Sequence, residues 1–479
     1  MIEKYNIIFV VVDALRAQNL KAYGYAEETM PYTRKYIDEY GTVFLSSYST
    51  TDQTDPSFTS IFSGRHPIVH GIIRHGTEVT IKELSLFRKT KTKLLAELLR
   101  KQGYITIGID WLSRWHKRGF LYYGEPHELT CSKTLLSSLM SKKYVSGFLR
   151  RIYLETPNFF SSLVIKAYNS LGIYQHLDAM SFIEAAKKCI KSVLSTHKPF
   201  FIEIHLWDTH TPFHLPKPYR RVNLSENEKI PIGTIIRNIK SAEWREKVIT
   251  YHLRGIRYVP EVEKYYNNAI RYVDKALYSL FTFLEDLRIF DNTIIVITGD
   301  HGDNLIRDNI FMGHGGLYQR VIKVPLFILN MPTYFCKRIK GLVQHIDIVP
   351  TLLDILNIPL GKYEVNGMSL KMDLSLGKSS RKYVFTVSSV APKRYSFIDD
   401  EERFKIIFSP KVEDGIDKYG GLWFKSKIEL YDLKKDPDEQ LNIAKDNPDL
   451  AKHLIKEANK VLKRYVKQRI KLIVKNAML

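Results

Sequence analysis

Cysteine is scarce in this sequence. Only three cysteines occur among 479 residues, Cys131, Cys189 and Cys336, and they are widely separated. A disulfide framework needs a larger set of cysteines, and a cysteine zinc site needs them in closely spaced pairs, so neither is indicated. So low a content is typical of a protein from a reducing compartment.

Long apolar runs and leader signals are missing as well. The first apolar stretch, Ile7 to Val12, has only the length of a strand, and no basic start or small-residue cleavage site accompanies it. No apolar run reaches the roughly 18 residues of a membrane span. We therefore expect a cytoplasmic protein whose contact with membranes, if any, is peripheral.

Acidic residues are outnumbered by basic ones. Lysine and arginine total 72 against 51 aspartates and glutamates, a formal net charge of +21. A basic surface suits anionic substrates, nucleic acid or an anionic membrane face, and a generally basic solvated surface gives the same number. No nucleic-acid recognition module is recognisable, so we expect an anionic partner other than nucleic acid.

Apolar, β-branched segments alternate with helical ones along most of the chain. Hydrophobic residues make up 44% of the sequence, enough for a large packed core. The strand-like segments are Asn6–Asp13, Gly103–Asp110, Pro199–Leu206 and Asn292–Thr298, and the helical ones include Thr92–Lys101 and Lys264–Asp286. This alternation predicts an α/β fold with a mostly parallel central sheet flanked by helices.

The pattern changes toward the C-terminus, which predicts two domains. Residues 1–375 form the expected catalytic domain, with a basic insertion at about 132–174 that is either a lid, a membrane-facing helix or an ordinary packed insertion. Residues 376–479 form a smaller α+β subdomain with short alternating strands and a lysine-rich helix at about Asp449–Lys475. That helix either docks on its own domain or lies on an anionic membrane.

Two groups of residues suggest a reactive centre. Ligands of parallel sheets bind beyond the carboxyl ends of the strands, where Asp13, Asp300 and His301 fall. An Asp-His pair in a glycine-flanked turn presents oxygen and nitrogen ligands to a metal. With Thr54 as a fourth ligand, we expect calcium, magnesium or manganese, or zinc if more histidines join.

Thr54 begins a Thr-x-Pro-Ser string that ends at Ser57. Such a string often starts a helix, and Thr54 would then be its cap. The functional alternative places the Thr54 hydroxyl at a helix N-terminus, where an anion is stabilised. Arg65, farther along, is expected to bind either an ester oxygen or the neighbourhood of the nucleophile as a fixed cation.

Histidines follow two more strand-end signals. His210 lies in the stretch Asp208–Pro212, and His314 lies between glycines. A lone histidine is usually structural, but convergence on one sheet edge favours substrate-oxygen or leaving-group contacts for both. Asp208 and His345 are weaker candidates.

With these motifs in view, the sequence resembles the sulfatase family of the alkaline phosphatase superfamily over nearly the whole chain. The matching motifs are Val12–Arg16, Tyr23-Gly24, Thr54–Phe58 with Gly64-Arg65, Trp207–Pro212, Tyr272–Asp274, Asp291–Thr293, Gly299–Gly302, Lys323–Leu326, Asp347–Leu352, Glu429–Leu433, Asp436-Pro437 and Leu441-Asn442. The resemblance implies the fold of that superfamily.

Three residues depart from the family pattern. The signature cysteine or serine, from which family members make formylglycine, is Thr54 here. Oxidised threonine would be a ketone and not that aldehyde, so no formylglycine is expected. Phe58 replaces the signature arginine, and Ala14 replaces the second aspartate of the usual metal-binding pair.

Threonine is the nucleophile in related phosphodiesterases and phosphoethanolamine transferases of the superfamily. The resemblance therefore implies a metal-dependent hydrolase or transferase in which Thr54 attacks a phosphate mono- or diester, or a sulfate ester, with the phosphoester favoured. A glycan, a lipid headgroup and a small phosphodiester all remain open as substrates. The alternative is a catalytically silent relative that binds an anionic glycan or lipid. Nothing indicates the oligomeric state.

Overall fold

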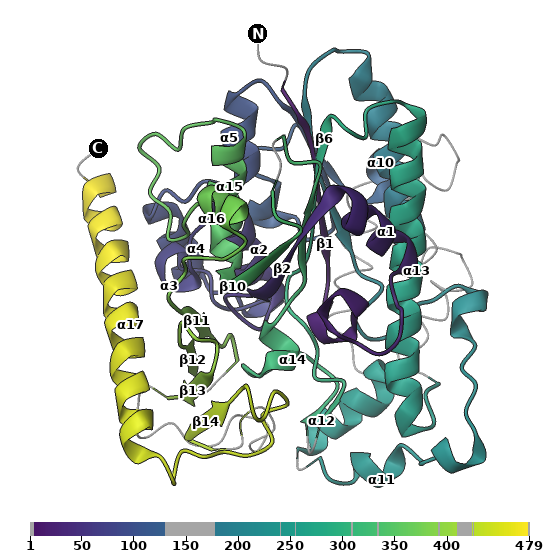
Figure 1. Cartoon of the computed structure of the whole chain (residues 1–479), viewed down its shortest axis with the longest axis vertical. Coiled ribbons are helices and arrows are strands. Elements are labelled where there is room, and N and C mark those ends of the chain that lie inside the picture. Colours follow the sequence, from purple (N-terminus) through teal and green to yellow (C-terminus); the bar gives the residue numbers. More distant parts are fainter. Residues whose placement is uncertain are drawn as a thin grey trace.

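An eight-stranded sheet runs through the centre of the structure (Figure 1). The structure is a computed structural model that describes residues 4–129, 178–239, 241–253, 255–307, 310–332, 335–390, 393–409, 424 and 426–477. The strands of the sheet are β1 (Asn6–Val12), β2 (Gly41–Tyr48), β3 (Ile105–Ile109), β4 (Tyr122–Gly124), β5 (Phe200–Leu206), β6 (Thr293–Gly299), β9 (Leu326–Leu329) and β10 (Arg338–Gln344). The expected insertion at 132–174 lies outside the described residues.

The sheet is parallel except at one strand. Its order is β10-β2-β9-β6-β1-β5-β3-β4, and β9 runs antiparallel to both β2 and β6. Val12 at the end of β1 pairs with Leu206 of β5 and Gly299 of β6, so three neighbouring strands end level with one another. Residues that follow these strands therefore meet at one edge, as the mostly parallel sheet predicted from the sequence requires.

Helices cover both faces of the sheet (Figure 1). One face packs on α10 (Ala179–Leu194) and α13 (Val259–Asp286), and α1 (Pro31–Tyr40) lies beside α13. The other face packs on α2 (Thr54–Ser63), α5 (Leu95–Lys101) and α15 (Ile348–Ile355). Strand β1 is buried throughout because its alternate side chains enter the two cores, Ile8 and Val10 on one side and Ile7 and Phe9 on the other.

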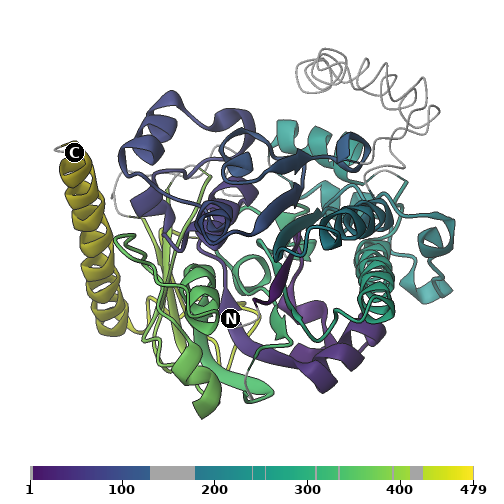
Figure 2. The same ribbon diagram turned by 90° about the horizontal axis from the view of Figure 1, so that it is seen from above.

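A second, antiparallel sheet follows near the C-terminus. Its strands are β11 (Val384–Val387), β12 (Tyr395–Ile398), β13 (Phe404–Phe408) and β14 (Ile428–Asp432), in that order. The helix α17 (Pro448–Ala477) runs along the outside of the molecule, apart from the helices of the main sheet (Figure 2). One side of α17, with Leu454, Ala458 and Val461, is buried in the core of the small sheet. The α/β fold with a small C-terminal sheet is thus confirmed, while the division after residue 375 stays a prediction.

The remaining elements are short. None of the described helices, short or long, is long and apolar enough to cross a membrane. The other helices are α3 (Pro67–His70), α4 (Ile81–Lys89), α6 (Pro126–Leu129), α11 (Gly233–Ile236), α12 (Ala242–Lys247), α14 (Gln319–Ile322) and α16 (Lys371–Leu376), and a two-stranded ribbon joins β7 (Ile306–Arg307) to β8 (Ile310–Phe311).

Candidate active site

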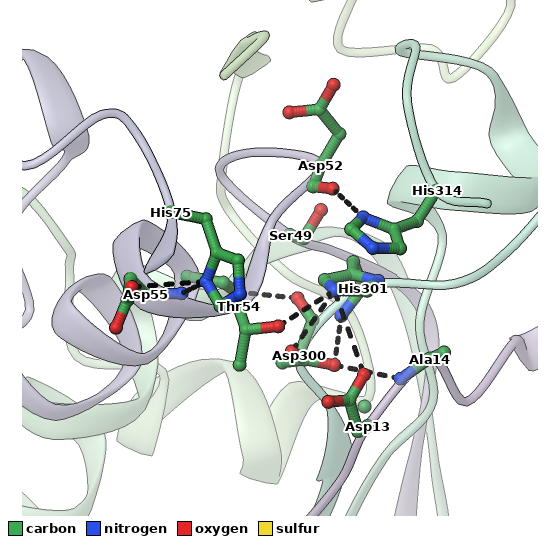
Figure 3. A network of polar contacts seen from close by, with 12 residues as sticks. Asp13, Ala14, Ser49, Asp52, Thr54, Asp55, His75, Asp300, His301 and His314 are labelled. Atoms are coloured by element: carbon green, nitrogen blue, oxygen red, sulfur yellow. Dashed lines mark hydrogen bonds and ion pairs between the residues drawn. The ribbon is translucent and has the colours of Figure 1, made fainter. Parts of the chain in front are cut away.

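The carboxyl ends of β1 and β6 bring together three side chains, those of Asp13, Asp300 and His301 (Figure 3). One ligand atom from each lies within 4.8 Å of the other two, and all three residues are buried. Asp300 Oδ2 is 3.3 Å from His301 Nε2, and Asp13 Oδ1 is 3.8 Å from the same nitrogen. Two carboxylates and one imidazole at this spacing can enclose a divalent cation.

The hydrogen-bonding state of the two carboxylates fits such a cation. Both oxygens of Asp13 and Oδ2 of Asp300 are buried, with no hydrogen-bond partner among the residues that the structure describes. Burial, and then the charge of Asp13, raise the pKa of Asp300 to about 7. Buried carboxylates without donors are costly unless paired or bound to metal, so the donor set suits a hard or borderline metal ion.

The backbone after β1 adds a further contact. Ala14 adopts a positive φ of 57°, a conformation that L-residues rarely take. Its amide donates to Asp300 Oδ1 at 3.0 Å, and the His301 amide donates to the same oxygen at 2.8 Å. Asp300 is therefore oriented with Oδ1 toward the backbone and Oδ2 toward His301. The position of the family's second aspartate thus contributes an amide instead of a carboxylate.

Thr54 is the first residue of α2, and its hydroxyl faces the cluster (Figure 3). Oγ1 lies 3.2 Å from His301 Nε2. The N-cap position of α2 is Gln53, so Thr54 is not the cap of this helix. Ser57, one turn later, donates to the Asp300 carbonyl at 2.6 Å, which ties the start of α2 to the turn after β6.

Asp55, which the sequence analysis did not single out, fixes the other side of this helix start. Its carboxylate binds Arg114 at 2.5 Å, His116 at 3.0 Å and His75 at 3.1 Å. Burial raises the pKa of Asp55, but its hydrogen bonds with His116 and His75 outweigh burial and leave the pKa well below the ordinary value. Arg114 and two histidines thus fix the position of Asp55, the residue next to Thr54.

His314 and His210 lie next to the cluster. The His314 ring stacks on His301 at 4.2 Å between centroids, and the His210 ring lies 5.4 Å from that of His314. Nδ1 of His314 lies 2.8 Å from the carbonyl of Asp52, and Nδ1 of His210 lies 2.6 Å from the carbonyl of Thr211. In each ring Nδ1 therefore carries the proton, which leaves Nε2 for other partners.

The two weaker candidates, Asp208 and His345, contact neighbouring groups and lie outside the cluster. Asp208 is buried, accepts from the Ala179 amide at 3.1 Å, and has its pKa raised to about 7 by burial. His345 supports Ser57, with Nδ1 3.2 Å from its hydroxyl, and burial lowers its pKa to about 3. Neither belongs to the metal-binding group of Asp13, Asp300 and His301.

Arg65 is placed differently from the expectation. Its guanidinium donates to the carbonyls of Glu364 and Thr90 and to the hydroxyl of Thr92, and it lies 4.4 Å from the ring centre of Tyr363. These contacts join loops beyond the far end of α2. The geometry therefore gives no support to a contact between Arg65 and an ester oxygen.

His205 is a second residue that the sequence analysis did not select. It lies on β5, with Nδ1 2.9 Å from Asp110 Oδ1 and Nε2 3.6 Å from Asp13 Oδ2. Burial lowers the pKa of His205, but Asp110 and Asp13 raise it well above the ordinary value. The only signal in the sequence was His205 itself, which lies with Glu203 among the apolar residues of a strand.

The loop before Thr54 is bound to the small C-terminal sheet. Asp52 accepts from the Ser389 amide at 2.7 Å and from the Gly316 amide at 3.0 Å. The Val387 amide donates to the Thr50 carbonyl at 3.1 Å. The small sheet therefore contributes directly to the conformation of the loop that carries Thr54.

Comparisons with known proteins identify the family of this chain. The family model described as Sulfatase matches residues 5–358. A Delta 4,5-hexuronate-2-O-sulfatase of Bacteroides thetaiotaomicron is 24% identical, covering 93% of this chain and 85% of the relative. An N-acetylgalactosamine-6-O-sulfatase of the same organism is 22% identical, covering 94% and 92%.

Solved structures give the same fold. The phosphonate monoester hydrolase of Agrobacterium radiobacter superposes with a TM-score of 0.66 and 19% identity, covering 97% of this chain and 96% of that one. Family model, relatives and fold agree along most of the chain, so it belongs to the sulfatase family and is a hydrolase of sulfuric or phosphoric esters.

Proposed function

We propose that this protein is a metal-dependent phosphoester hydrolase or transferase with Thr54 as its nucleophile. The observation that carries the proposal is the position of the Thr54 hydroxyl, 3.2 Å from His301 Nε2 at the start of α2. A side-chain oxygen at a helix N-terminus, beside buried carboxylates that lack donors, suits a nucleophile activated as an alkoxide.

The cation would be held by Asp13, Asp300 and His301, with Thr54 as a further ligand. When bound, it supplies Lewis-acid polarisation of the ester and lowers the pKa of the Thr54 hydroxyl. A site of mostly oxygen ligands with one ring nitrogen favours calcium, magnesium or manganese over zinc.

The residues of the chain then carry out the steps of the reaction. Thr54 Oγ1 gives its proton to water and attacks phosphorus in line. Its new bond to phosphorus forms as the bond to the leaving oxygen breaks, which gives a phosphothreonine and an alcohol that takes its proton from water. The helix N-terminus of α2 stabilises the attacking oxygen. Water or an acceptor alcohol then cleaves the phosphothreonine and regenerates Thr54. The enzyme is a hydrolase if water is the acceptor and a transferase if an alcohol is.

His210 and His314 are assigned to contacts with a substrate oxygen or the leaving oxygen. Burial, and then the neighbouring His301 and His210, lower the pKa of His314 well below its ordinary value. His314 is then neutral, with its proton on Nδ1 facing the Asp52 carbonyl, so its Nε2 accepts and does not donate. Nδ1 of His210 faces the Thr211 carbonyl in the same way, so both rings present Nε2 to the substrate.

Sulfate-ester hydrolysis is the second candidate, because the relatives above are named as sulfatases of sugar derivatives. A sulfated threonine lacks the elimination route that an aldehyde hydrate offers, which ranks phosphate ahead of sulfate. An anionic ester on a glycan is the substrate that these relatives favour, ahead of a lipid headgroup or a small phosphodiester.

The test is turnover of matched aryl phosphate monoester, phosphodiester and sulfate substrates by protein loaded with manganese, magnesium or calcium. Thr54→Ala is the inactive variant, and Thr234→Ala, on the exposed helix α11, is the matched control. Phosphoester turnover that only Thr54→Ala loses supports the proposal. Preferred sulfate turnover overturns the phosphoester assignment, and no turnover with any metal favours a silent binding protein.

A further inference from the structure

The ring of His205 lies between two carboxylates from different strands. Nδ1 is 2.9 Å from Asp110 Oδ1, and Nε2 is 3.6 Å from Asp13 Oδ2. The side chains of His205 and Asp13 are fully buried. Nε2 of His205 and both oxygens of Asp13 have no hydrogen-bond partner, so the contact between them is an ion-pair distance and not a closed hydrogen bond.

Asp110 holds the ring from behind. This carboxylate also accepts from the Tyr123 hydroxyl and from the Leu112 amide at 3.0 Å. Because a carboxylate that already receives two donors acts as an acceptor, the His205 nitrogen that faces it donates a proton. The ring is thereby fixed with Nε2 pointing to Asp13.

Aromatic rings prevent His205 from turning away. The Phe58 ring lies 4.4 Å from the His205 ring, and the Trp111 ring stacks at 5.8 Å with an interplanar angle of 20°. Phe58 belongs to α2, the helix that begins with Thr54. His205 is therefore packed from the nucleophile's helix as well as from Asp110.

Asp13 needs such neighbours because no hydrogen bond from the described residues fixes its carboxylate plane. The terminal torsion of an aspartate is broad and has no sharp rotamer preference. Oδ1 faces His301 at 3.8 Å and Oδ2 faces His205 at 3.6 Å. The two imidazoles thus define which oxygen points to the metal-binding group and which points away from it.

His205 is not itself a member of that group. Among the described residues, the set of ligand atoms within 4.8 Å of one another contains Asp13, Asp300 and His301 only. The role that fits His205 is therefore exerted through Asp13, as outer residues commonly orient the ligands of a metal.

We propose that His205, held by Asp110, is a positioning residue that orients the Asp13 carboxylate for metal binding. The inference rests on the proposed metal site. It assigns a role to a residue on β5 that no motif marks, and it explains why an imidazole occupies a buried strand position beside β1.

The experiment compares two substitutions at the same position. In His205→Gln the side-chain amide reaches the place of Nε2 and still faces Asp13, whereas in His205→Asn the amide reaches only the place of Nδ1 and faces Asp110. Glu203→Gln is the matched control, because Glu203 is buried on the same face of β5 but makes no contact with Asp13. Manganese affinity is measured by EPR titration, with thermal unfolding of the metal-free proteins to confirm folding.

We expect His205→Asn to weaken manganese binding about 10- to 100-fold, as loss of an outer residue does. His205→Gln should recover most of the affinity, Glu203→Gln should match the wild type, and excess manganese should restore turnover in His205→Asn. Unchanged affinity in His205→Asn, or equal losses in the Asn and Gln variants, overturns the positioning role alone. A wild type that binds no manganese overturns the proposed metal site and this role with it.

Discussion

The hydroxyl oxygen of Thr54 lies 3.2 Å from Nε2 of His301. The two residues are 247 positions apart, one at the start of a helix and the other after a central strand. The same ring nitrogen lies 3.3 Å from Asp300 Oδ2, so a single imidazole joins the candidate nucleophile to the candidate metal ligands. Four predictions follow from this site and from the framework that carries it.

The first concerns Asp300, which we replace with Asn. Burial and the charge of Asp13 disfavour the ionised form of Asp300, so we expect the metal-free variant to be more stable by about 1–2 kcal/mol. The amide oxygen still accepts from the Ala14 and His301 amides. Thermal unfolding with and without manganese checks this, with the exposed Asp291→Asn as control. If manganese raised the Tm of the variant as much as that of the wild type, the role of Asp300 as a metal ligand would be contradicted.

The second concerns Asp55, next to Thr54. Replacing it with Asn leaves Arg114 without its counter-charge and weakens the contact with His116, so the free energy of unfolding should fall by about 3 kcal/mol. The start of α2 should loosen, and kcat should fall more than KM rises. Urea unfolding and steady-state kinetics measure the two effects. Arg114→Gln should cost less, because that side chain is 38% exposed; an equal or larger cost would contradict the assignment.

The third concerns pH and His66, which joins α3 to the small sheet. Burial lowers the pKa of His66 to about 3, while an unfolded histidine titrates near 6.5. Between these values the unfolded chain binds more protons, so this residue's contribution to stability is lost as pH falls from about 6.5 toward 3, by at most about 1.4 kcal/mol per pH unit.

His66→Gln tests this pH dependence. The glutamine keeps a donor for the Phe385 carbonyl, which His66 Nε2 contacts at 3.0 Å, but it does not titrate. Unfolding free energies measured from pH 7 to pH 5 should fall less steeply in the variant than in the wild type. The exposed His453→Gln is the control and should keep the wild-type slope. An identical slope in His66→Gln would refute the prediction.

The fourth concerns the buried ion pair of Lys405 and Glu439. Both side chains are fully buried and lie 2.6 Å apart, and Glu439 also accepts from the Gln319 amide. Lys405→Met should destabilise the protein by about 3–5 kcal/mol because it leaves a buried carboxylate without its cation. Adding Glu439→Gln should recover part of that loss, since the amide still accepts from Gln319. Additive losses in the double variant would contradict this coupling.

The central strands were predictable because burial on both faces leaves a simple pattern. Strands β1 and β6 have continuous apolar runs, and β5 is apolar except for Glu203 and His205, whereas β2 contains Ser46 and Ser47, and β9 has only four residues. Strand β10 lies at the edge of the sheet and exposes Arg338 and Lys340. Those strands were not predicted, because their stability depends on neighbours that the local sequence does not specify.

The candidate site was predictable to the extent that its residues end strands. Asp13, Asp300 and His301 follow β1 and β6, so topology alone brings them together. Asp55 pairs with Arg114 across 59 positions, and His205 meets Asp110 across 95, which no local pattern encodes. Arg65 occupies a motif position and was expected at the site. Its guanidinium instead donates to backbone carbonyls of Glu364 and Thr90.

The hydrogen bond between Asp52 and Ser389 has a consequence for the order of folding. These residues are 337 positions apart, so a chain synthesised from its N-terminus presents the Thr54 loop long before strand β11 exists. Contacts of such long range form late because the loop that they close is large. The loop that carries Thr54 therefore acquires its last hydrogen bonds only when the small sheet docks, and a growing chain completes its reactive centre only after Ser389 has been made.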